Sequence, residues 1–149
     1  MISLSDAIND YNTWTPAQLV QEYGSSAKAA KAAGVSTRTM ERWVTAKGTQ
    51  KRKPSKPSQE KINQAGREAN ADKTMGIEFD GTAAINGPAS NPDYVREWYH
   101  DFTFSPEEWA ELSERAAAGD ESGLWDMIAD KYQVNSIEFI DGTINIGEE

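Results

Sequence analysis

Two arginines one helical turn apart, Arg38 and Arg42, are the residues of this sequence best suited to contact the edges of DNA bases. A guanidinium group can donate two hydrogen bonds together to O6 and N7 of a guanine, which contributes roughly 1–3 kcal/mol of discrimination. Ser36 and Thr37 precede Arg38 at the start of the same expected helix, and the first residues of a recognition helix are the ones that contact base edges. We therefore expect Ser36, Thr37, Arg38 and Arg42 to contact bases.

The segment that would position these residues, Ser26–Val44, is typical of a helix-turn-helix. Small residues on the first helix let the two helices approach, a glycine takes up the left-handed turn, and larger apolar residues anchor the second helix. Seven residues fit these positions: Ala29, Ala30, Ala33, Gly34, Val35, Met40 and Trp43. The alternative interpretation is an ordinary alanine-rich helical hairpin that binds no ligand.

Further basic residues lie within this segment and after it. Three are expected to lie over phosphates: Lys28, Lys31 and Lys47. Four more follow in a proline-containing run: Lys51, Arg52, Lys53 and Lys56. We interpret this run as an arm that contacts the DNA backbone or the minor groove, and its alternative is a solvated linker kept extended by charge.

Charge is divided unevenly along the chain, whose formal net charge is -9. Residues 25–73 hold twelve Lys and Arg against four acids, whereas residues 74–149 hold three against seventeen. Such asymmetry indicates a division of labour, in which only the first part can neutralise phosphates. DNA would repel the acidic part, so we expect it to contact protein, either a second copy of the chain or a replication protein.

The sequence predicts an α+β fold in three parts. Residues 1–48 form a helical domain, residues 49–73 a basic linker and a polar helix, and residues 74–149 an acidic domain with a small antiparallel sheet and two helices.

In the first part Ser5 is expected to cap a helix over Asp6–Tyr11. A second helix begins after Thr15, with Gln18 completing a capping box and Gly24 ending it. Ser25 or Ser26 caps the next helix, and Ser36 the one after it, which ends at Gly48. Pro54 and Pro57 should bar a helix from residues 49–58. A polar helix over Gln59–Ala71 then needs a partner surface to be stable.

In the acidic domain, Gly76–Asn86 predicts a strand pair or a strand with a bend. Alternating apolar residues over Trp98–Phe104 predict a strand. Ser105 and Glu108 form a capping box for a helix, and a second helix is expected over Glu121–Tyr132. The last segment, Ser136–Ile146, predicts a hairpin with Asp141-Gly142 as its turn, pairing Phe139 with Ile144.

Several function classes find no support in the residues. There is no Cys, no apolar run long enough for a membrane span and no signal-peptide pattern, so we expect a cytoplasmic protein associated with the nucleoid. No phosphate-binding, dinucleotide-binding or nucleophile motif is present, and the acids lack a metal-ligand spacing. His100, the single histidine, is expected to be packed in the core. We therefore predict no enzyme activity, no metal and no cofactor.

The order of the parts resembles that of a known family. AKAAKAAGVSTRTMERWV, the basic run KRKPSKPS, a polar helix, the DGTAAINGPASNPD loop and the SPEEWAEL helix are together similar to terminal proteins of actinobacterial linear replicons, the Streptomyces telomere-protein family. The resemblance covers most of residues 15–147. It implies a role in replication or in maintaining DNA ends, with a telomere-associated protein and a DNA polymerase as partners.

In that family a protein hydroxyl becomes linked to the 5′ end of DNA and primes synthesis, and Thr82 is the hydroxyl in the matching stretch. Two other interpretations stay open. The chain is a plasmid or phage transcriptional regulator that dimerises through its acidic domain, or the acidic domain mimics DNA and the basic part is secondary.

Overall fold

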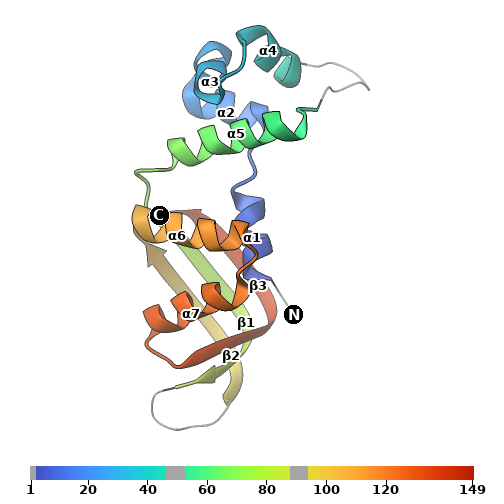
Figure 1. The fold of residues 1–149 in the computed structure, drawn as a ribbon. Coiled ribbons are helices and arrows are strands. Elements are labelled where there is room, and N and C mark those ends of the chain that lie inside the picture. Colours follow the sequence, from blue (N-terminus) through green and yellow to red (C-terminus); the bar gives the residue numbers. More distant parts are fainter. Residues whose placement is uncertain (1–2, 46–52, 88–93) are drawn as a thin grey trace. The chain divides into compact units, whose positions relative to one another are not determined.

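The computed structural model describes residues 3–45, 53–87 and 94–149, and within them the chain has a mixed α+β fold, as predicted (Figure 1). The elements, in chain order, are α1 (Leu4–Tyr11), α2 (Pro16–Tyr23), α3 (Ser26–Ala33), α4 (Thr37–Thr45), α5 (Lys56–Ala69), β1 (Met75–Asn86), β2 (Tyr94–Phe104), α6 (Pro106–Ala117), α7 (Glu121–Tyr132) and β3 (Ser136–Glu148).

Contacts divide the chain into two compact units. The sheet unit comprises Met1–Tyr11 and Lys73–Glu149, and the helical unit comprises Asn12–Asp72. The helical unit is therefore an insertion in the chain of the sheet unit. This division differs from the expected boundaries after residues 48 and 73, because α1 packs in the sheet unit and α5 in the helical unit.

Helix α1 belongs to the sheet unit because Leu4 and Ile8 are fully buried in its core. The backbone N–H groups of Leu4 and Ser5 donate to the carboxylate of Glu121 at the start of α7. The expectation that Ser5 caps a helix beginning at Asp6 is wrong: the helix begins at Leu4, and Ser3 Oγ accepts the Asp6 N–H at 3.1 Å.

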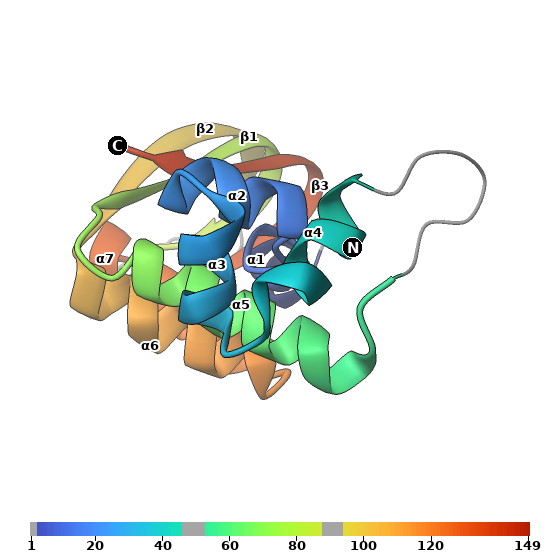
Figure 2. The same ribbon diagram turned by 90° about the horizontal axis from the view of Figure 1, so that it is seen from above.

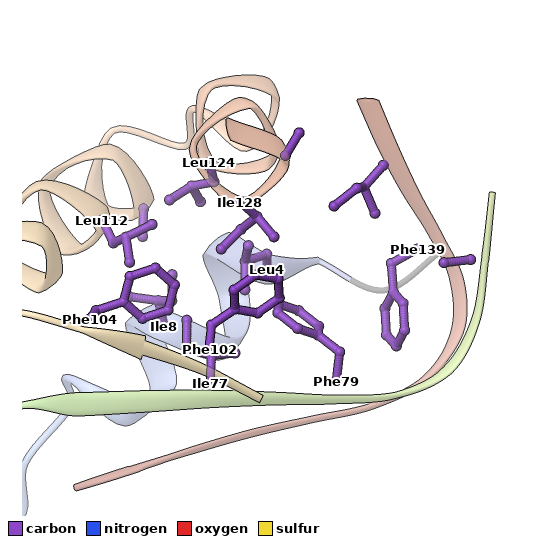
Figure 3. Close-up of a cluster of buried hydrophobic side chains, with 14 of the residues drawn as sticks. Leu4, Ile8, Ile77, Phe79, Phe102, Phe104, Leu112, Leu124, Ile128 and Phe139 are labelled. Carbon is purple, nitrogen blue, oxygen red and sulfur yellow. The ribbon is translucent and has the colours of Figure 1, made fainter. Parts of the chain in front are cut away.

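The sheet has three antiparallel strands in the order β2-β1-β3. Helices α1, α6 and α7 cover one of its faces, and side chains from both layers meet between them (Figure 3). Phe79 lies at the centre of this core. Its ring centroid is 5.3–5.8 Å from the ring centroids of four neighbours, Trp98, Phe102, Trp125 and Phe139. The odd-numbered residues of β1 point to this core, and the even-numbered ones point to the uncovered face.

The predicted hairpin over Ser136–Ile146 is wrong. The segment is one strand, in which Phe139 pairs with Ala83 and Ile144 pairs with Phe79 of β1. A bulge opposite the step from Thr82 to Ala83 makes Ile140 an extra residue. One extra residue shifts the alternation of apolar side chains just as a two-residue turn would, so the sequence pattern fits both structures. Gly76–Asn86, likewise, lies within a single strand.

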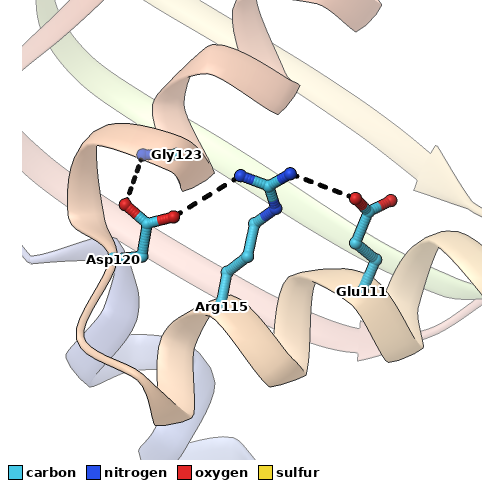
Figure 4. A network of polar contacts seen from close by, with 4 residues as sticks. All are labelled: Glu111, Arg115, Asp120 and Gly123. Carbon is cyan, nitrogen blue, oxygen red and sulfur yellow. Dashed lines mark hydrogen bonds and ion pairs between the residues drawn. The ribbon is translucent and has the colours of Figure 1, made fainter.

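Local capping fixes the helices of the sheet unit. The Ser105 N–H donates to Glu108 Oε1 at 2.9 Å, and the Glu108 N–H donates to Ser105 Oγ at 3.2 Å, so the predicted capping box is confirmed. At the start of α7, Asp120 accepts the Gly123 N–H at 3.0 Å. Arg115 links Glu111 and Asp120 at 3.2 and 3.4 Å (Figure 4).

The helical unit is built on small residues. Its buried hydrophobic residues are Leu19, Ala29, Ala30, Ala33, Met40, Ile62 and Ala65. The predicted Thr15–Gln18 capping box is confirmed, and Ser25 caps α3. Gly24 and Gly34, which follow α2 and α3, have φ values of 93° and 71°, in the left-handed region.

Helix α5 begins at Lys56, three residues earlier than expected, with Pro57 in its first turn. The expectation that Pro57 bars a helix is wrong, because the first-turn N–H groups of a helix have no intrahelical partner and their loss costs nothing there. The weak apolar stripe of α5 packs against its own unit, since Ile62 and Ala65 are fully buried. Tyr23 donates its hydroxyl to the Ala65 carbonyl at 2.9 Å. Burial raises the Tyr23 pKa, and the nearby negative charges of Glu68 and Glu22 add to the rise.

Candidate nucleic-acid interface

Figure 2 shows the chain turning between α3 and α4, over residues 34–36. Backbone hydrogen bonds close this turn. The Gly34 N–H donates to the Lys31 carbonyl at 3.3 Å, and the Val35 N–H donates to the Ala30 carbonyl at 3.0 Å. Val35 is half-buried against the core of the helical unit. The left-handed conformation of Gly34 is what allows the chain to reverse within so few residues.

Helix α4 starts at a cap made by Ser36. The Thr39 N–H donates to Ser36 Oγ at 3.1 Å, and the Ser36 hydroxyl donates to Thr39 Oγ1 at 2.8 Å. The sequence prediction of this cap is confirmed. Ser36 is exposed, but its hydroxyl proton already has an acceptor, so in this conformation the group offers DNA an acceptor rather than a donor.

Buried residues fix how α4 is rotated about its axis. Met40 is fully buried, and Trp43 and Val44 pack against the same core. With 3.6 residues per turn, these positions share one side of the helix. The side chains of Thr37, Arg38, Glu41 and Arg42 are exposed and share the opposite side. The structure therefore brings together three of the four predicted base-contacting residues on one exposed helix face.

The predicted phosphate contacts are only partly within the described residues. Lys28 and Lys31 are exposed on α3, and Lys53 and Lys56 are exposed before and at the start of α5. Within the described part of the chain, no acid forms an ion pair with Lys28, Lys31, Arg38 or Arg42. Lys47, Lys51 and Arg52 lie outside the described residues.

Sequence reasoning missed Glu41. It lies on the exposed face of α4 between Arg38 and Arg42, three residues after the first and directly before the second. An acid on a helix face proposed to contact a polyanion is unexpected, and its spacing of three residues from Arg38 is the sequence signal that could have placed it there. Glu41 also has an interaction partner in the structure.

The uncovered face of the sheet is acidic. Strand alternation and register place six carboxylates on it, those of Glu78, Asp80, Glu97, Asp101, Glu138 and Asp141. Tyr99 lies among them and is 59% exposed. Its hydroxyl is 3.4 Å from Asp101 Oδ2. Desolvation raises the pKa of Tyr99, and the negative charges of Asp101 and Glu78 raise it further.

Thr82, the hydroxyl that the family resemblance singles out, lies on this same face. In the register of the sheet it pairs with Glu97 of β2 on one side and Asp141 of β3 on the other. A shallow pocket lined by Asp80, Gly81, Thr82, Glu97, Trp98 and Tyr99 surrounds it. Thr82 is therefore half-buried, and its partners on both neighbouring strands carry carboxylates.

Other candidate chemistry is limited in the described ranges. His100 is half-buried, with ring centroids 4.4 Å from Phe102 and 4.7 Å from Tyr132, in agreement with the expected packing role. Among the described residues, no three His, Cys, Asp or Glu side chains are grouped as metal ligands would be. None of the helices described here has both the length and the apolar character that a membrane crossing requires.

Comparisons of the chain with models of protein families, with curated proteins and with solved structures find no match. The assignment of function therefore depends on the geometry and charge of the two units.

Proposed function

We propose that the helical unit binds double-stranded DNA as a helix-turn-helix, with α4 in the major groove. One observation carries the proposal: the exposed face of α4 bears Thr37, Arg38 and Arg42, directly after a tight turn and a capped helix start. The two arginines lie one turn apart, and an α-helix of this kind fits the major groove of B-DNA.

Phosphate contacts by the lysines around this helix would supply most of the affinity. Lys28 and Lys31 on α3, Lys47 after α4, and the arm Lys51, Arg52, Lys53 and Lys56 are the residues we assign to this role. Contacts of this kind release condensed counterions and carry no base specificity, so they make binding strongly dependent on salt.

The biological role we propose is replication or DNA-end maintenance on a mobile or linear replicon, similar to that of a terminal protein. The order of the parts along the chain supports it. The acidic face of the sheet unit, which DNA would repel, is proposed to contact a replication protein or a second copy of the chain. Thr82 is the hydroxyl that would prime synthesis if the role includes a covalent link to DNA.

A second candidate is a dimeric transcriptional regulator with the same DNA-binding helix. Exposed apolar side chains on the sheet unit favour a self-association surface, with Val95 58% and Tyr99 59% exposed. The two roles differ in the DNA they require. A dimeric regulator prefers a duplex with two half-sites about one helical turn apart, whereas a terminal protein prefers DNA ends or folded single-stranded palindromes.

Selection of bound sequences from a random duplex pool, at a stated salt concentration, tests the proposal. We expect a defined site for the unaltered protein and a loss of preference at individual base pairs for Arg38→Ala and for Arg42→Ala. Arg67→Ala on α5 is the matched control, because it removes the same charge from an exposed position on another helix of this unit. Equal loss of preference in all three variants, or no selected site at all, would contradict the proposal.

A further inference from the structure

One face of the three-stranded sheet has no helix packed on it within the described residues of the sheet unit, because α1, α6 and α7 all pack on the other face. Strands of eleven to thirteen residues make this open face about 35 Å long and about 10 Å across. An antiparallel sheet can expose a polar face to water, so an open face does not by itself indicate a partner. The arrangement of charged and apolar side chains on it does.

The six carboxylates of this acidic face are spread over it rather than clustered. Rows of side chains that point to the same face are two residues apart along a strand, or about 7 Å. No Lys, Arg or His occupies the described positions of this face, so the negative charge extends over about 20 Å without a basic residue. In the register of the sheet, four successive rows hold Glu138, then Glu97 with Asp141, then Asp80, then Glu78 with Asp101.

Exposed apolar side chains lie among these carboxylates. Val95 and Tyr99 flank Glu97 on the same face of β2, and both are exposed. Ile140, the extra residue of the bulge, is also exposed, and it follows Phe139, whose side chain lies in the core. Strand alternation therefore places Ile140 on the open side. Apolar side chains surrounded by charged ones are typical of a surface that contacts another protein.

Charge complementarity selects the partner surface. The acidic face of a second copy is excluded, because the carboxylates of the two faces would repel one another. The helical unit of a second copy offers the complementary charge. Its exposed Lys28, Lys31, Arg38 and Arg42 form no ion pair with an acid in the described part of the chain. Arg38 and Arg42 are about 6 Å apart along their helix axis, which is close to the row spacing of the acidic face.

The size of the acidic face limits the strength of such a contact. Its dimensions give an area of about 350 Å², whereas a stable complex buries about 800 Å² on each partner. A contact of this size, formed largely between exposed charges, is weak and is weakened further by salt. Another polyanion can therefore displace it readily.

We propose that the acidic face of one copy binds the basic surface of the helical unit of a second copy, and that duplex DNA competes with the acidic face for that surface. The free protein then self-associates, and a copy whose basic surface is occupied does not bind DNA. A reciprocal pair and an open chain of copies both satisfy this arrangement. The competition rests on the proposed function of the helical unit, whereas the self-association does not.

Sedimentation velocity of the full chain, over a range of protein and salt concentrations, tests the proposal. The triple variant Asp80→Asn, Glu97→Gln and Glu138→Gln removes one exposed carboxylate from each strand. We expect it to raise the Kd of self-association about tenfold. The matched control removes three exposed carboxylates from α6 and α7 and should self-associate like the unaltered protein; it carries Glu107→Gln, Glu114→Gln and Asp126→Asn.

A mixing experiment identifies the second surface. A quadruple variant in which Lys28, Lys31, Arg38 and Arg42 are replaced by Gln should also fail to self-associate. Mixed with the triple variant of the acidic face, it should associate, because each variant supplies the surface that the other lacks. Equal thermal midpoints of the variants and the unaltered protein check that the fold is intact. If the triple variant unfolds, its three single substitutions replace it.

The outcomes separate this inference from DNA binding. A protein that stays monomeric at every concentration overturns the inference, and so does self-association that the acidic-face variant and its control weaken equally. A mixture of the two variants that does not associate overturns it as well. A short duplex of unrelated sequence should dissociate the assembly. If copies associate but the duplex neither binds nor displaces them, the proposed function of the helical unit fails and the self-association stands. If the duplex binds a protein that never self-associates, DNA binding stands and the inference fails.

Discussion

Gly81 and Gly142 lie opposite each other in the register of β1 and β3, next to the bulge that follows Thr82. A Cβ on Gly81 would overlap the backbone of Asp141 and Gly142, and a Cβ on Gly142 would overlap the backbone of Asp80 and Gly81. Gly142 also has a φ of 129°, which side chains rarely adopt. The two strands therefore approach closely at a point where neither tolerates a side chain.

We expect Gly81→Ala to destabilise the sheet unit by about 1–3 kcal/mol, because the added methyl meets backbone atoms that cannot move aside cheaply. Urea unfolding followed by tryptophan fluorescence measures the effect. Gly147→Ala on β3 is the matched control, since a Cβ there has open space, and it should change stability by less than about 0.5 kcal/mol. Equal midpoints for the two variants would show that β1 and β3 do not approach as described.

Features that depend on residues close together in the chain were predictable from the sequence, whereas the pairing at Gly81 and Gly142 was not. Capping residues act within a few positions of the chain, so the Thr15–Gln18 and Ser105–Glu108 boxes were predicted correctly. The Asp141-Gly142 step is different, because it suits either a hairpin turn or a bulge. The choice between them depends on whether another strand, β1, is available as a partner, and that is a long-range property.

The candidate site divides in the same way. Exposure of Arg38 and Arg42 follows from the helical spacing of Met40 and Trp43, so the sequence alone predicts it. The assignment of α1 to the sheet unit was not predictable. It depends on Leu4 meeting a core made by residues more than seventy positions later, and on a hydrogen bond to Glu121.

Gly66→Ala should destabilise the helical unit, although alanine is intrinsically the better helix former by about 1 kcal/mol. Gly66 is buried, and a Cβ there would overlap the indole ring of Trp14. We expect a net loss of about 1–3 kcal/mol, measured by thermal unfolding followed by circular dichroism.

A double-mutant cycle supplies the control. In a Trp14→Ala background the overlap is gone, so adding Gly66→Ala should cost nothing or stabilise the helix. A Gly66→Ala penalty that is the same in both backgrounds would place its cause elsewhere than at Trp14.

Acid should weaken one contact of α6 in a defined direction. The Ser105 N–H lowers the pKa of Glu108, and its ion pair with Lys131 at 3.0 Å lowers it further. A carboxyl whose pKa is lower in the folded state contributes stability that is complete above its unfolded pKa. That contribution is lost as the pH falls through the folded pKa.

Glu108→Gln isolates this contribution, because a glutamine still accepts the cap N–H, as Gln18 does for Thr15. We expect the variant to be less stable than the unaltered protein by up to about 1 kcal/mol at neutral pH, and the difference to vanish in acid. Urea midpoints across the pH range measure it, with Glu107→Gln as the control at an exposed neighbouring position. A difference that grows as the pH falls would reverse the sign and contradict the assignment.

Replacing the arm residues Lys51, Arg52, Lys53 and Lys56 with serine should weaken binding to all DNA sequences alike. Each phosphate contact contributes about one unit to the slope of log affinity against log salt, so we expect the slope to flatten by several units. Fluorescence anisotropy of a labelled duplex over a range of salt concentrations measures the slope. An unchanged slope would mean that the run is a solvated linker.

The strongest test of the terminal-protein role concerns Thr82. If its hydroxyl primes synthesis, incubation with a DNA polymerase and dCTP labelled at the α-phosphate should transfer label to the protein: a bond forms between Thr82 Oγ and that phosphate, and pyrophosphate leaves. Thr82→Ala should carry no label. Thr143→Ala is the matched control, because Thr143 is an exposed threonine that pairs with Asp80 on the same sheet. Label that persists in Thr82→Ala would move the link to another residue. No label on the unaltered protein under any condition would leave only the DNA-binding role, since binding by α4 requires no covalent step.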